Sequence, residues 1–160
     1  MPGKRAVFLD RDGVINRECN FVTSWSEFEF LPGIVKAIGI LNEAGILVII
    51  ITNQSGIKRG YFTENTMHEI HRNMQRILAE RGAWVDDIYF CPHTDEEHCE
   101  CRKPKPGMLI AAADEHGIDL LRSWVIGDSP RDVTAGRRVG CQTQLFTESD
   151  DIGEIINRII

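Results

Sequence analysis

The order of apolar and amphipathic segments constrains the fold of this chain more than any other feature of its sequence. Short apolar runs, several of them β-branched and nearly continuous, alternate with helical patterns. Such runs are typical of strands that are covered on both faces, and strands that alternate with helices form parallel sheets with helices on both faces. We therefore predict a Rossmann-like α/β fold. The apolar runs cover residues 6–9, 46–51, 88–90, 124–126 and 142–146.

Five amphipathic segments lie between and after these runs and predict helices. The second segment has Met67, Ile70 and Met74 on one face. Thr63 is placed to cap the start of this helix, and Gly82 is placed to end it. The predicted helices cover residues 33–44, 63–81, 108–116, 132–139 and 150–160.

The charge balance and the beginning of the chain exclude several partners. A net charge of −6 without a basic stripe argues against a nucleic-acid partner, but not against a small phosphorylated metabolite. The first apolar run is too short for a signal peptide or a membrane span, so we expect a cytoplasmic protein without a membrane partner. The 160 residues, 42% of them hydrophobic, fit a single globular domain over residues 1–160, as a monomer or a weak homo-oligomer.

Polar side chains follow the predicted strands. In parallel α/β sheets, ligands bind beyond the C-terminal ends of the strands, so these side chains are expected to share one crevice. Each segment alone also fits a solvated turn, but four carboxylates cannot share a crevice without a cation, and oxygen ligands suit Mg²⁺. The sequence lacks the glycine-rich motifs of P-loop and dinucleotide-binding enzymes. The residues concerned are Asp10, Asp12, Thr52, Asn53, Asp128 and Asp132, together with a cationic turn that contains Lys103.

A second metal site is predicted where three of the five cysteines gather within eleven residues. Cys91 and His93, followed by Cys99 and Cys101, provide three thiolates and one imidazole, which is typical of a closed, tetrahedral structural zinc site. His98 competes with His93, but it adjoins Cys99, and adjacent residues tend to point apart. We expect this zinc to order a loop rather than to take part in chemistry. The remaining cysteines, Cys19 and Cys141, are expected to be packing residues.

Four segments of the chain, in order, resemble the motifs of the haloacid dehalogenase superfamily. They are the sequences DRDGVIN (10–16), ITNQSG (51–56), Lys103 and GDSPRD (127–132), and the resemblance spans about residues 5–146. Within the superfamily, the DRDG start and the CPH…CxCRKP segment resemble small phosphatases that act on D-glycero-D-manno-heptose 1,7-bisphosphate or on histidinol phosphate. Residues 52–62 and 105–109 are more similar to the heptose enzymes, whereas the short spacing between the zinc-ligand pairs is more similar to the histidinol enzymes.

The resemblance implies phosphate ester hydrolysis through an aspartyl-phosphate. It makes Asp10 the nucleophile. It makes Asp12 the general acid that protonates the leaving group and then the base that activates water. Mg²⁺ would be held by Asp10, the backbone carbonyl of Asp12, and Asp128.

The same resemblance assigns roles to the residues around the nucleophile. Thr52 and Asn53 would bind phosphoryl oxygens, and Lys103 would neutralise the charge on the transferring group. Asp132 would orient Lys103 or support the metal, and the capping of the helix that follows is an equally good explanation for this residue.

Two arginines are candidates for substrate binding. Arg59 and Arg102 could hold a second phosphate or a sugar hydroxyl, because a planar guanidinium suits bidentate contact with phosphate. For Arg59, an exposed loop cation is an equally good interpretation. Neither residues 14–31 nor residues 54–87 leave room for a cap domain, so we expect a capless protein in which the zinc loop forms one wall of an open site.

Four functions compete on the sequence alone. A heptose 1,7-bisphosphate 7-phosphatase is favoured because Arg59 suits a second phosphate. A histidinol-phosphate phosphatase would use the same chemistry on a substrate with an ammonium and an imidazole. A DNA 3′-phosphatase is disfavoured by the net charge of −6. A zinc-stabilised binding module without catalysis is disfavoured by the intact set of aspartates and lysine.

Overall fold

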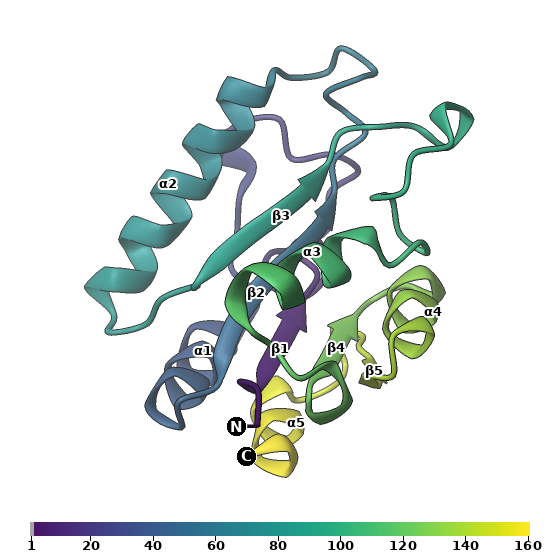
Figure 1. Ribbon diagram of the computed structural model, residues 1–160. Helices are drawn as coiled ribbons and strands as arrows, with labels where there is room; N and C mark the ends of the chain where they lie inside the picture. The colour runs from purple at the N-terminus through teal and green to yellow at the C-terminus, as the bar shows by residue number, and fades with distance from the viewer. Residues whose placement is uncertain (1) are drawn as a thin grey trace.

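A five-stranded parallel sheet forms the centre of the computed structural model, which describes residues 2–160 (Figure 1). The strand order is β3-β2-β1-β4-β5. The chain runs outward from β1 to one edge and then returns to place β4 beside β1, so the C-terminal ends of these two strands form the topological switch point at which ligands bind. The strands are β1 (Ala6–Leu9), β2 (Leu47–Asn53), β3 (Asp87–Cys91), β4 (Trp124–Gly127) and β5 (Gln142–Leu145).

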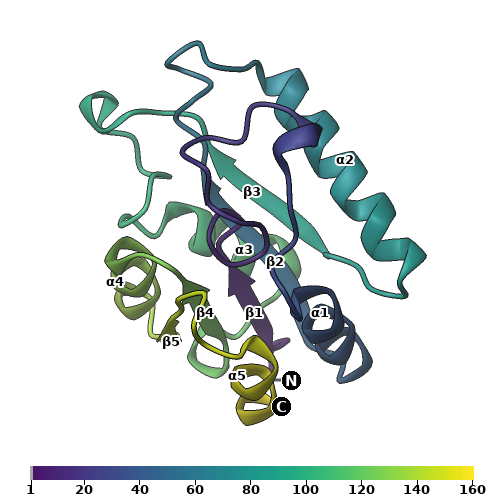
Figure 2. The ribbon, with the colours of Figure 1, turned by 180° about the vertical axis from the view of Figure 1, so that it is seen from behind.

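Helices cover both faces of this sheet, which confirms the predicted Rossmann-like fold (Figures 1 and 2). Helices α1, α2 and α5 pack on one face, and α3 and α4 pack on the other. Three short 3-10 helices were not predicted. The helices are α1 (Ile34–Glu43), α2 (Glu64–Glu80), α3 (Gly107–His116), α4 (Pro130–Arg138) and α5 (Ile152–Ile159), and the 3-10 helices are η1 (Trp25–Glu27), η2 (Asp95–Glu97) and η3 (Leu120–Arg122).

The central strand β1 is buried on both of its faces. Val7 and Leu9 belong to the core beneath α1, α2 and α5, whereas Ala6 and Phe8 belong to the core beneath α3 and α4. Burial on both sides explains why this strand is a continuous apolar run. It also fixes the backbone from which Asp10 emerges.

Local capping sets the helix ends. The Thr63 hydroxyl accepts a hydrogen bond from the Thr66 backbone at 3.1 Å, which confirms the predicted cap of α2. Helix α4 differs from the prediction, because it begins at Pro130 and Ser129 is its N-cap. Asp132 is therefore not the N-cap residue, but the third residue of the helix in a capping box with Ser129.

The described residues contain no cap domain. The segment between β1 and α1 carries only η1, and the segment between β2 and α2 has no helix or strand. The crevice at the C-terminal ends of β1 and β4 is thus left open, as expected. Among residues 2–160, no helix combines the length and the apolar character needed to cross a bilayer.

Candidate active site

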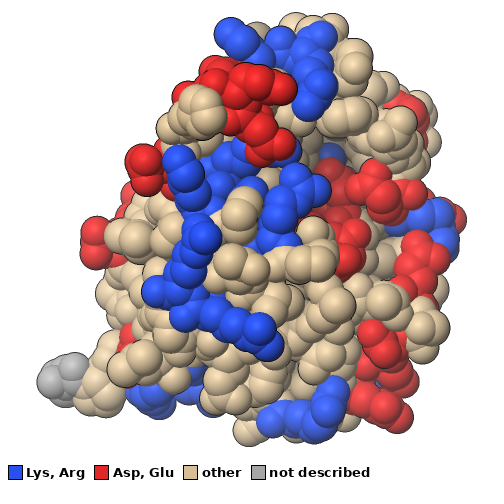
Figure 3. Space-filling model, turned by 90° about the vertical axis from the view of Figure 1, so that its right-hand side faces the viewer, with Lys and Arg blue, Asp and Glu red and all other residues tan. Residues whose placement is uncertain are grey.

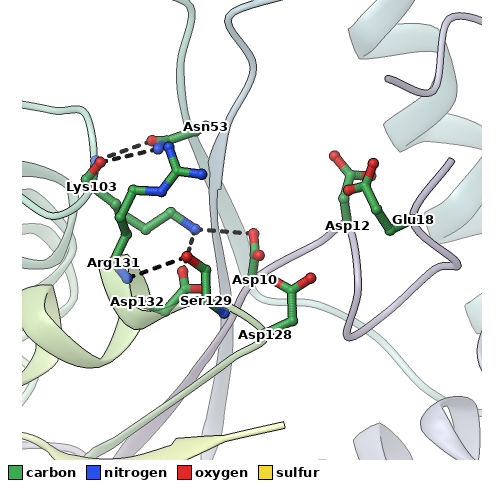
Figure 4. Close-up of a pocket in the computed structure, with 9 residues that line it drawn as sticks. All are labelled: Asp10, Asp12, Glu18, Asn53, Lys103, Asp128, Ser129, Arg131 and Asp132. Carbon is green, nitrogen blue, oxygen red and sulfur yellow. Dashed lines mark hydrogen bonds and ion pairs between the residues drawn. The ribbon is translucent and has the colours of Figure 1, made fainter. Parts of the chain in front are cut away.

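Three carboxylates meet where β1 and β4 end. Asp10 directly follows β1, Asp128 directly follows β4, and Asp132 lies in the first turn of α4. Their oxygens approach within 4.8 Å of one another (Figure 4). The strand order produces this cluster, because the two switch-point strands deliver their C-terminal residues to the same crevice.

Lys103 reaches this cluster from the loop between β3 and α3. Its Nζ lies 3.0 Å from Asp10 Oδ1, 2.6 Å from Asp132 Oδ1 and 3.0 Å from the carbonyl oxygen of Ile51, which occupies all three of its donors. Burial opposes the charged form of Lys103, but the two carboxylates outweigh burial and raise its pKa. The lysine is therefore a fixed positive charge beside Asp10.

The remaining negative charge fits a divalent cation. Burial raises the pKa of Asp10 well above its ordinary value; Lys103 opposes this shift, and the neighbouring carboxylates add to it. The pKa of Asp128 is raised as well, mainly by burial. Asp132 uses one oxygen for Lys103 and the other for the backbone N–H of Ser129, at 3.2 Å. Asp10 and Asp128 are consequently the side chains that fit Mg²⁺, an oxygen-preferring ion.

Two glycines make room for these carboxylates. Gly13 has a φ of +93°, and a Cβ at this position would lie 1.9 Å from Asp128 Oδ2. A Cβ on Gly127 would lie 2.2 Å from the side chain of Asp132. The glycine of the DRDG sequence is thus required for the close approach of the two strand ends, and not only for a turn.

Asp12 lies across the pocket from Lys103 (Figure 4). Its Oδ1 accepts hydrogen bonds from Arg11, at 3.1 and 2.9 Å, and from Asn16 Nδ2 at 2.9 Å. Its Oδ2 accepts one hydrogen bond, from Gln54 Nε2 at 3.2 Å. No role was predicted for Arg11, Asn16 or Gln54. Arg11 and Asn16 are sequence neighbours of Asp12, and their place in the DRDGVIN segment was the available signal, whereas Gln54 reaches Asp12 only because β2 lies beside β1.

Thr52 and Asn53 lie at the end of β2, beside the cluster. Thr52 is buried, and its hydroxyl accepts a hydrogen bond from Gln54 Nε2 at 2.8 Å. Asn53 lines the pocket, and its amide bonds with the main chain of Lys103 through both Oδ1 (3.1 Å) and Nδ2 (3.2 Å). Phosphate binding by these two residues stays a prediction, and the structure adds a role for Asn53 in positioning Lys103.

Two adjoining cavities form the open site. One of about 190 Å³ lies over the carboxylate cluster, and one of about 250 Å³ continues from it, with Asp12, Glu18 and Asn53 lining both. Lys and Arg side chains gather on the face of the molecule to the right of Figure 1, despite the net negative charge (Figure 3). Three arginines line the second cavity: Arg59, Arg102 and Arg131.

These arginines differ in how firmly hydrogen bonds and ion pairs hold their side chains. Arg59 has a 3.4 Å contact from Nε to the Ser55 hydroxyl. Arg102 is held by Asp95 at 2.7 Å and by the carbonyl oxygen of His93 at 3.3 Å. Arg131 lines both cavities and was not identified from the sequence. Its place in the GDSPRD segment, in the first turn of the helix that follows the strand end, was the available signal.

The predicted zinc ligands come together in the loop that carries Lys103. The ligand atoms of Cys91, His93, Cys99 and Cys101 lie within 4.8 Å of one another. Four of the distances between pairs of these ligand atoms are 3.3–3.6 Å. The sulfur atoms of Cys91 and Cys101 lie 2.8 Å apart, which is too far for a disulfide bond. Four soft donors at this spacing fit a tetrahedral Zn²⁺ with bonds of about 2.0–2.3 Å.

The three thiols of the group differ in their pKa values. Burial opposes ionisation of Cys99, but hydrogen bonds from the Arg102 backbone and from the neighbouring thiols lower its pKa to about 7. Burial raises the pKa of Cys91 and of Cys101, so the arrangement of the four donors, and not their pKa values, carries the metal assignment. His98, the competing ligand, is not part of the group. Of the two remaining cysteines, Cys141 is buried as expected, whereas Cys19 is exposed, so its expected packing role is wrong.

Comparisons with known proteins agree with this geometry. A family model of haloacid dehalogenase-like hydrolases matches residues 4–140. The chain is 43% identical to the D-glycero-beta-D-manno-heptose-1,7-bisphosphate 7-phosphatase of Rhodopseudomonas palustris, over 99% of this chain and 92% of the relative. It is 45% identical to the protein of the same name from Helicobacter pylori, over 89% of this chain and 82% of the relative.

Among solved structures, the D,D-heptose 1.7-bisphosphate phosphatase from B. bronchiseptica complexed with magnesium and phosphate superposes with a TM-score of 0.92. It is 36% identical, and the match covers 97% of each chain. These matches cover nearly the whole sheet and the residues at the C-terminal ends of its strands. The chain therefore belongs to the haloacid dehalogenase-like hydrolases.

Proposed function

We propose that this chain is a magnesium-dependent phosphatase that removes the 7-phosphate of D-glycero-β-D-manno-heptose 1,7-bisphosphate. The observation that carries this proposal is the arginine-lined cavity beside Asp10, in a chain 43% identical to a phosphatase named for this substrate. When one phosphate of a bisphosphate lies at the nucleophile, the other needs a cationic partner, and guanidinium groups supply one.

The proposed reaction uses Asp10 as the nucleophile. Its carboxylate attacks phosphorus while Asp12 gives a proton to the departing sugar oxygen, which leaves an aspartyl-phosphate and the free alcohol. Asp12, now a base, takes a proton from the water that hydrolyses this intermediate. Lys103 holds the attacking carboxylate in place and neutralises charge that builds up on the phosphoryl oxygens. Thr52 and Asn53 are proposed to contact those oxygens.

Both metals are part of the proposal. Asp10 and Asp128, with the backbone carbonyl of Asp12, would hold Mg²⁺, which when bound lowers the repulsion between two anions, the nucleophile and the phosphate. Asp132 supports this site through Lys103. Cys91, His93, Cys99 and Cys101 would hold Zn²⁺, and this ion would order the loop. Action as one domain over residues 1–160, a cytoplasmic location, a monomeric or weakly oligomeric state and independence from nucleic acid remain predictions.

The charges of the second cavity favour a bisphosphate over histidinol phosphate. Its lining combines three arginines with two carboxylates, Asp12 and Glu18. Histidinol phosphate would bring an ammonium and an imidazole to this cavity, where Arg59, Arg102 and Arg131 would repel them. A distal phosphate instead meets the excess positive charge.

The direct test measures kcat/KM with Mg²⁺ for both anomers of heptose 1,7-bisphosphate and for histidinol phosphate on one preparation. We expect the β anomer to be preferred over histidinol phosphate by more than about tenfold, roughly 1.4 kcal/mol in transition-state binding. A preference for histidinol phosphate would overturn the substrate assignment. Asp10→Asn should remove turnover with either substrate, and turnover at the parent rate would overturn the nucleophile.

The distal phosphate has its own test. Arg102→Gln and Arg131→Gln should lower kcat/KM for heptose 1,7-bisphosphate by about tenfold or more, and should change kcat/KM for heptose 7-phosphate far less. Arg76→Gln, which alters an exposed arginine on α2 paired with Glu80, is the matched control and should leave both substrates unaffected. Equal losses with both substrates would show that the arginines do not hold the distal phosphate.

A further inference from the structure

The side chain of Arg11 is fully buried, and the proposed function gives it no role. Its guanidinium donates to Asp12 Oδ1 from Nε and Nη2, at 3.1 and 2.9 Å. Its Nη1 lies 3.1 Å from Nε2 of His71, a residue on the buried face of α2 that is only 5% exposed. A buried arginine keeps its charge, so each N–H directed into the protein needs an acceptor. His71 provides that acceptor.

His71 accepts this hydrogen bond only as a neutral ring. Burial, and after it the adjacent Arg11 guanidinium, lower the pKa of His71 to about 3, so the ring is uncharged near neutral pH. Because Nε2 faces a donor, the ring proton belongs on Nδ1. A protonated His71 would place two cations in contact and would leave Arg11 Nη1 without an acceptor.

The hydrogen bonds to Asp12 distinguish its two oxygens. Oδ1 receives three N–H groups, two from Arg11 and one from Asn16. Oδ2 receives one, from Gln54. A carboxylate oxygen has two lone pairs, so Oδ1 has no place for a proton and Oδ2 does. The atom that can carry a transferable proton is therefore fixed by the surroundings of the other oxygen.

We infer that His71 is a positioning residue for the acid step: acting through Arg11, it holds Asp12 so that Oδ2 faces the substrate with its proton. This inference rests on the proposed phosphatase function. In the step concerned, an Asp10 oxygen bonds to phosphorus, the bond from phosphorus to the ester oxygen breaks, and the Oδ2 proton moves to that oxygen. The products are the alcohol, the aspartyl-phosphate and an ionised Asp12.

The inference makes a prediction about leaving groups. An alkyl ester releases a strongly basic oxygen, so its cleavage needs the proton from Asp12. An aryl ester such as p-nitrophenyl phosphate releases a weakly basic phenolate, which leaves without one. Misplacement of Asp12 should therefore slow the hydrolysis of alkyl phosphates selectively, whereas general damage to the fold or to the nucleophile should slow both.

The test compares two substitutions of His71 whose side chains differ in length, so that only one of them can contact Arg11. His71→Gln places an amide oxygen near the position of Nε2, and His71→Asn is too short to meet Arg11. We expect His71→Asn to lower kcat/KM for the heptose bisphosphate, or for any alkyl phosphate that the parent hydrolyses, by about tenfold or more, a part of the 10²–10⁴ that a general acid supplies. Its kcat/KM for p-nitrophenyl phosphate should fall less than about twofold, and His71→Gln should recover most of the loss.

Several outcomes would overturn the inference. Equal losses on alkyl and aryl esters would show a merely structural role, and unchanged alkyl hydrolysis in His71→Asn would show no role. His68→Gln, on the same helix but half exposed and without a contact to Arg11, is the control and should resemble the parent. If His71→Asn does not fold, His71→Met, which has the length but only a weak acceptor, replaces it.

One measurement does not depend on turnover. Nitrogen-15 NMR of the parent should show His71 neutral, protonated on Nδ1 and unprotonated on Nε2, and a proton on Nε2 would refute the contact with Arg11. If the parent hydrolyses neither type of ester with Mg²⁺, the proposed phosphatase function fails. If it hydrolyses both and the ratio does not change in His71→Asn, only the positioning role fails.

Discussion

Asp10 and Asp12 are two residues apart, but their carboxylates have different surroundings. Asp10 ends a buried strand, pairs with Lys103 and shares its crevice with other carboxylates. Asp12 lies in the loop beyond the strand, where Arg11 and Gln54 surround it with donors. Neighbouring carboxylates with different environments can take the two roles of nucleophile and acid that the proposed reaction requires.

Gly13 is the residue whose replacement should separate metal binding from folding. In Gly13→Ala, the new Cβ would collide with Asp128 Oδ2, so Asp128 must move. We expect the Mg²⁺ concentration for half-maximal activity to rise about tenfold or more, within the range for disturbed support of a metal ligand.

The matched control for this substitution is Gly82→Ala. Gly82 also has a positive φ, +76°, but a Cβ there meets nothing within 4 Å. Both variants should lose about 1–2 kcal/mol of stability from backbone strain. Only Gly13→Ala should change the response to Mg²⁺, and a parental response would mean that Asp128 is not a ligand.

The buried ion pairs of Lys103 give a prediction about stability. In Asp132→Asn, Lys103 keeps Asp10 but loses one of its two carboxylates, in a site that is nearly inaccessible to water. We expect a loss of about 3 kcal/mol in the free energy of unfolding, measured with urea, and a lower kcat. Glu29→Gln breaks the exposed pair with Arg17 and should cost less than about 1 kcal/mol. Similar losses in the two variants would contradict the structural role of Asp132.

The segment between β3 and α3 is the element least able to order itself. It contains one short 3-10 helix, and many of its residues are partly or fully exposed. Its fixed points are the cysteine–histidine group and the two hydrogen bonds between Asn53 and the main chain of Lys103. The cysteine–histidine group begins where β3 ends and includes Cys101, two residues before Lys103, so the proposed zinc would support Lys103 through the adjoining backbone.

Removal of zinc should therefore affect activity before it affects the sheet. We expect one zinc per chain in the purified protein. A chelator in excess Mg²⁺, or Cys99→Ser, should lower kcat about tenfold or more and speed hydrogen exchange over residues 92–106, because Lys103 loses part of its support. Strands β1 and β2 should keep their protection. Cys19→Ser, which changes an exposed thiol, is the control, and full activity of a zinc-free chain would refute this role.

At the level of the whole molecule, the elements and the site differ in how far the sequence predicts them. The type and order of all five strands and five helices were predicted, because a strand buried on two faces, such as β1, needs a continuous apolar run. The zinc group was also predictable, since its spacing is local. The strand order was not, because apolar runs do not specify their neighbours.

Contacts between distant segments explain the rest of what was missed. Arg131 joins the second cavity only because β4 returns to lie beside β1. His71 meets Arg11 across sixty positions of sequence, and the helical pattern of α2 gave it no role. Motifs mark the residues at the reaction centre, whereas the residues that position them depend on how the elements pack.

The free energy of unfolding should depend on pH in a way that reflects the neutral state of His71. The pKa of His71 is about 3 in the folded chain, against an ordinary value of 6.5. Between these values only the unfolded chain binds the proton, so this group's contribution to stability is complete above about pH 6.5 and is lost as the pH falls toward 3. The raised pKa values of Asp10 and Asp128 act in the opposite direction, because there the folded chain binds protons first.

A comparison of variants isolates His71 from these carboxylates. His71→Gln keeps the contact with Arg11 but cannot titrate, so between about pH 6 and pH 5 the parent should lose about 1 kcal/mol more in the free energy of unfolding than this variant does. Urea unfolding without Mg²⁺ at a series of pH values measures the difference. His68→Gln should follow the parent, since this substitution leaves the ring of His71 and its contact with Arg11 in place. Parallel curves for the parent and His71→Gln would mean that His71 takes up its proton equally in both states, which is incompatible with a buried ring facing a guanidinium.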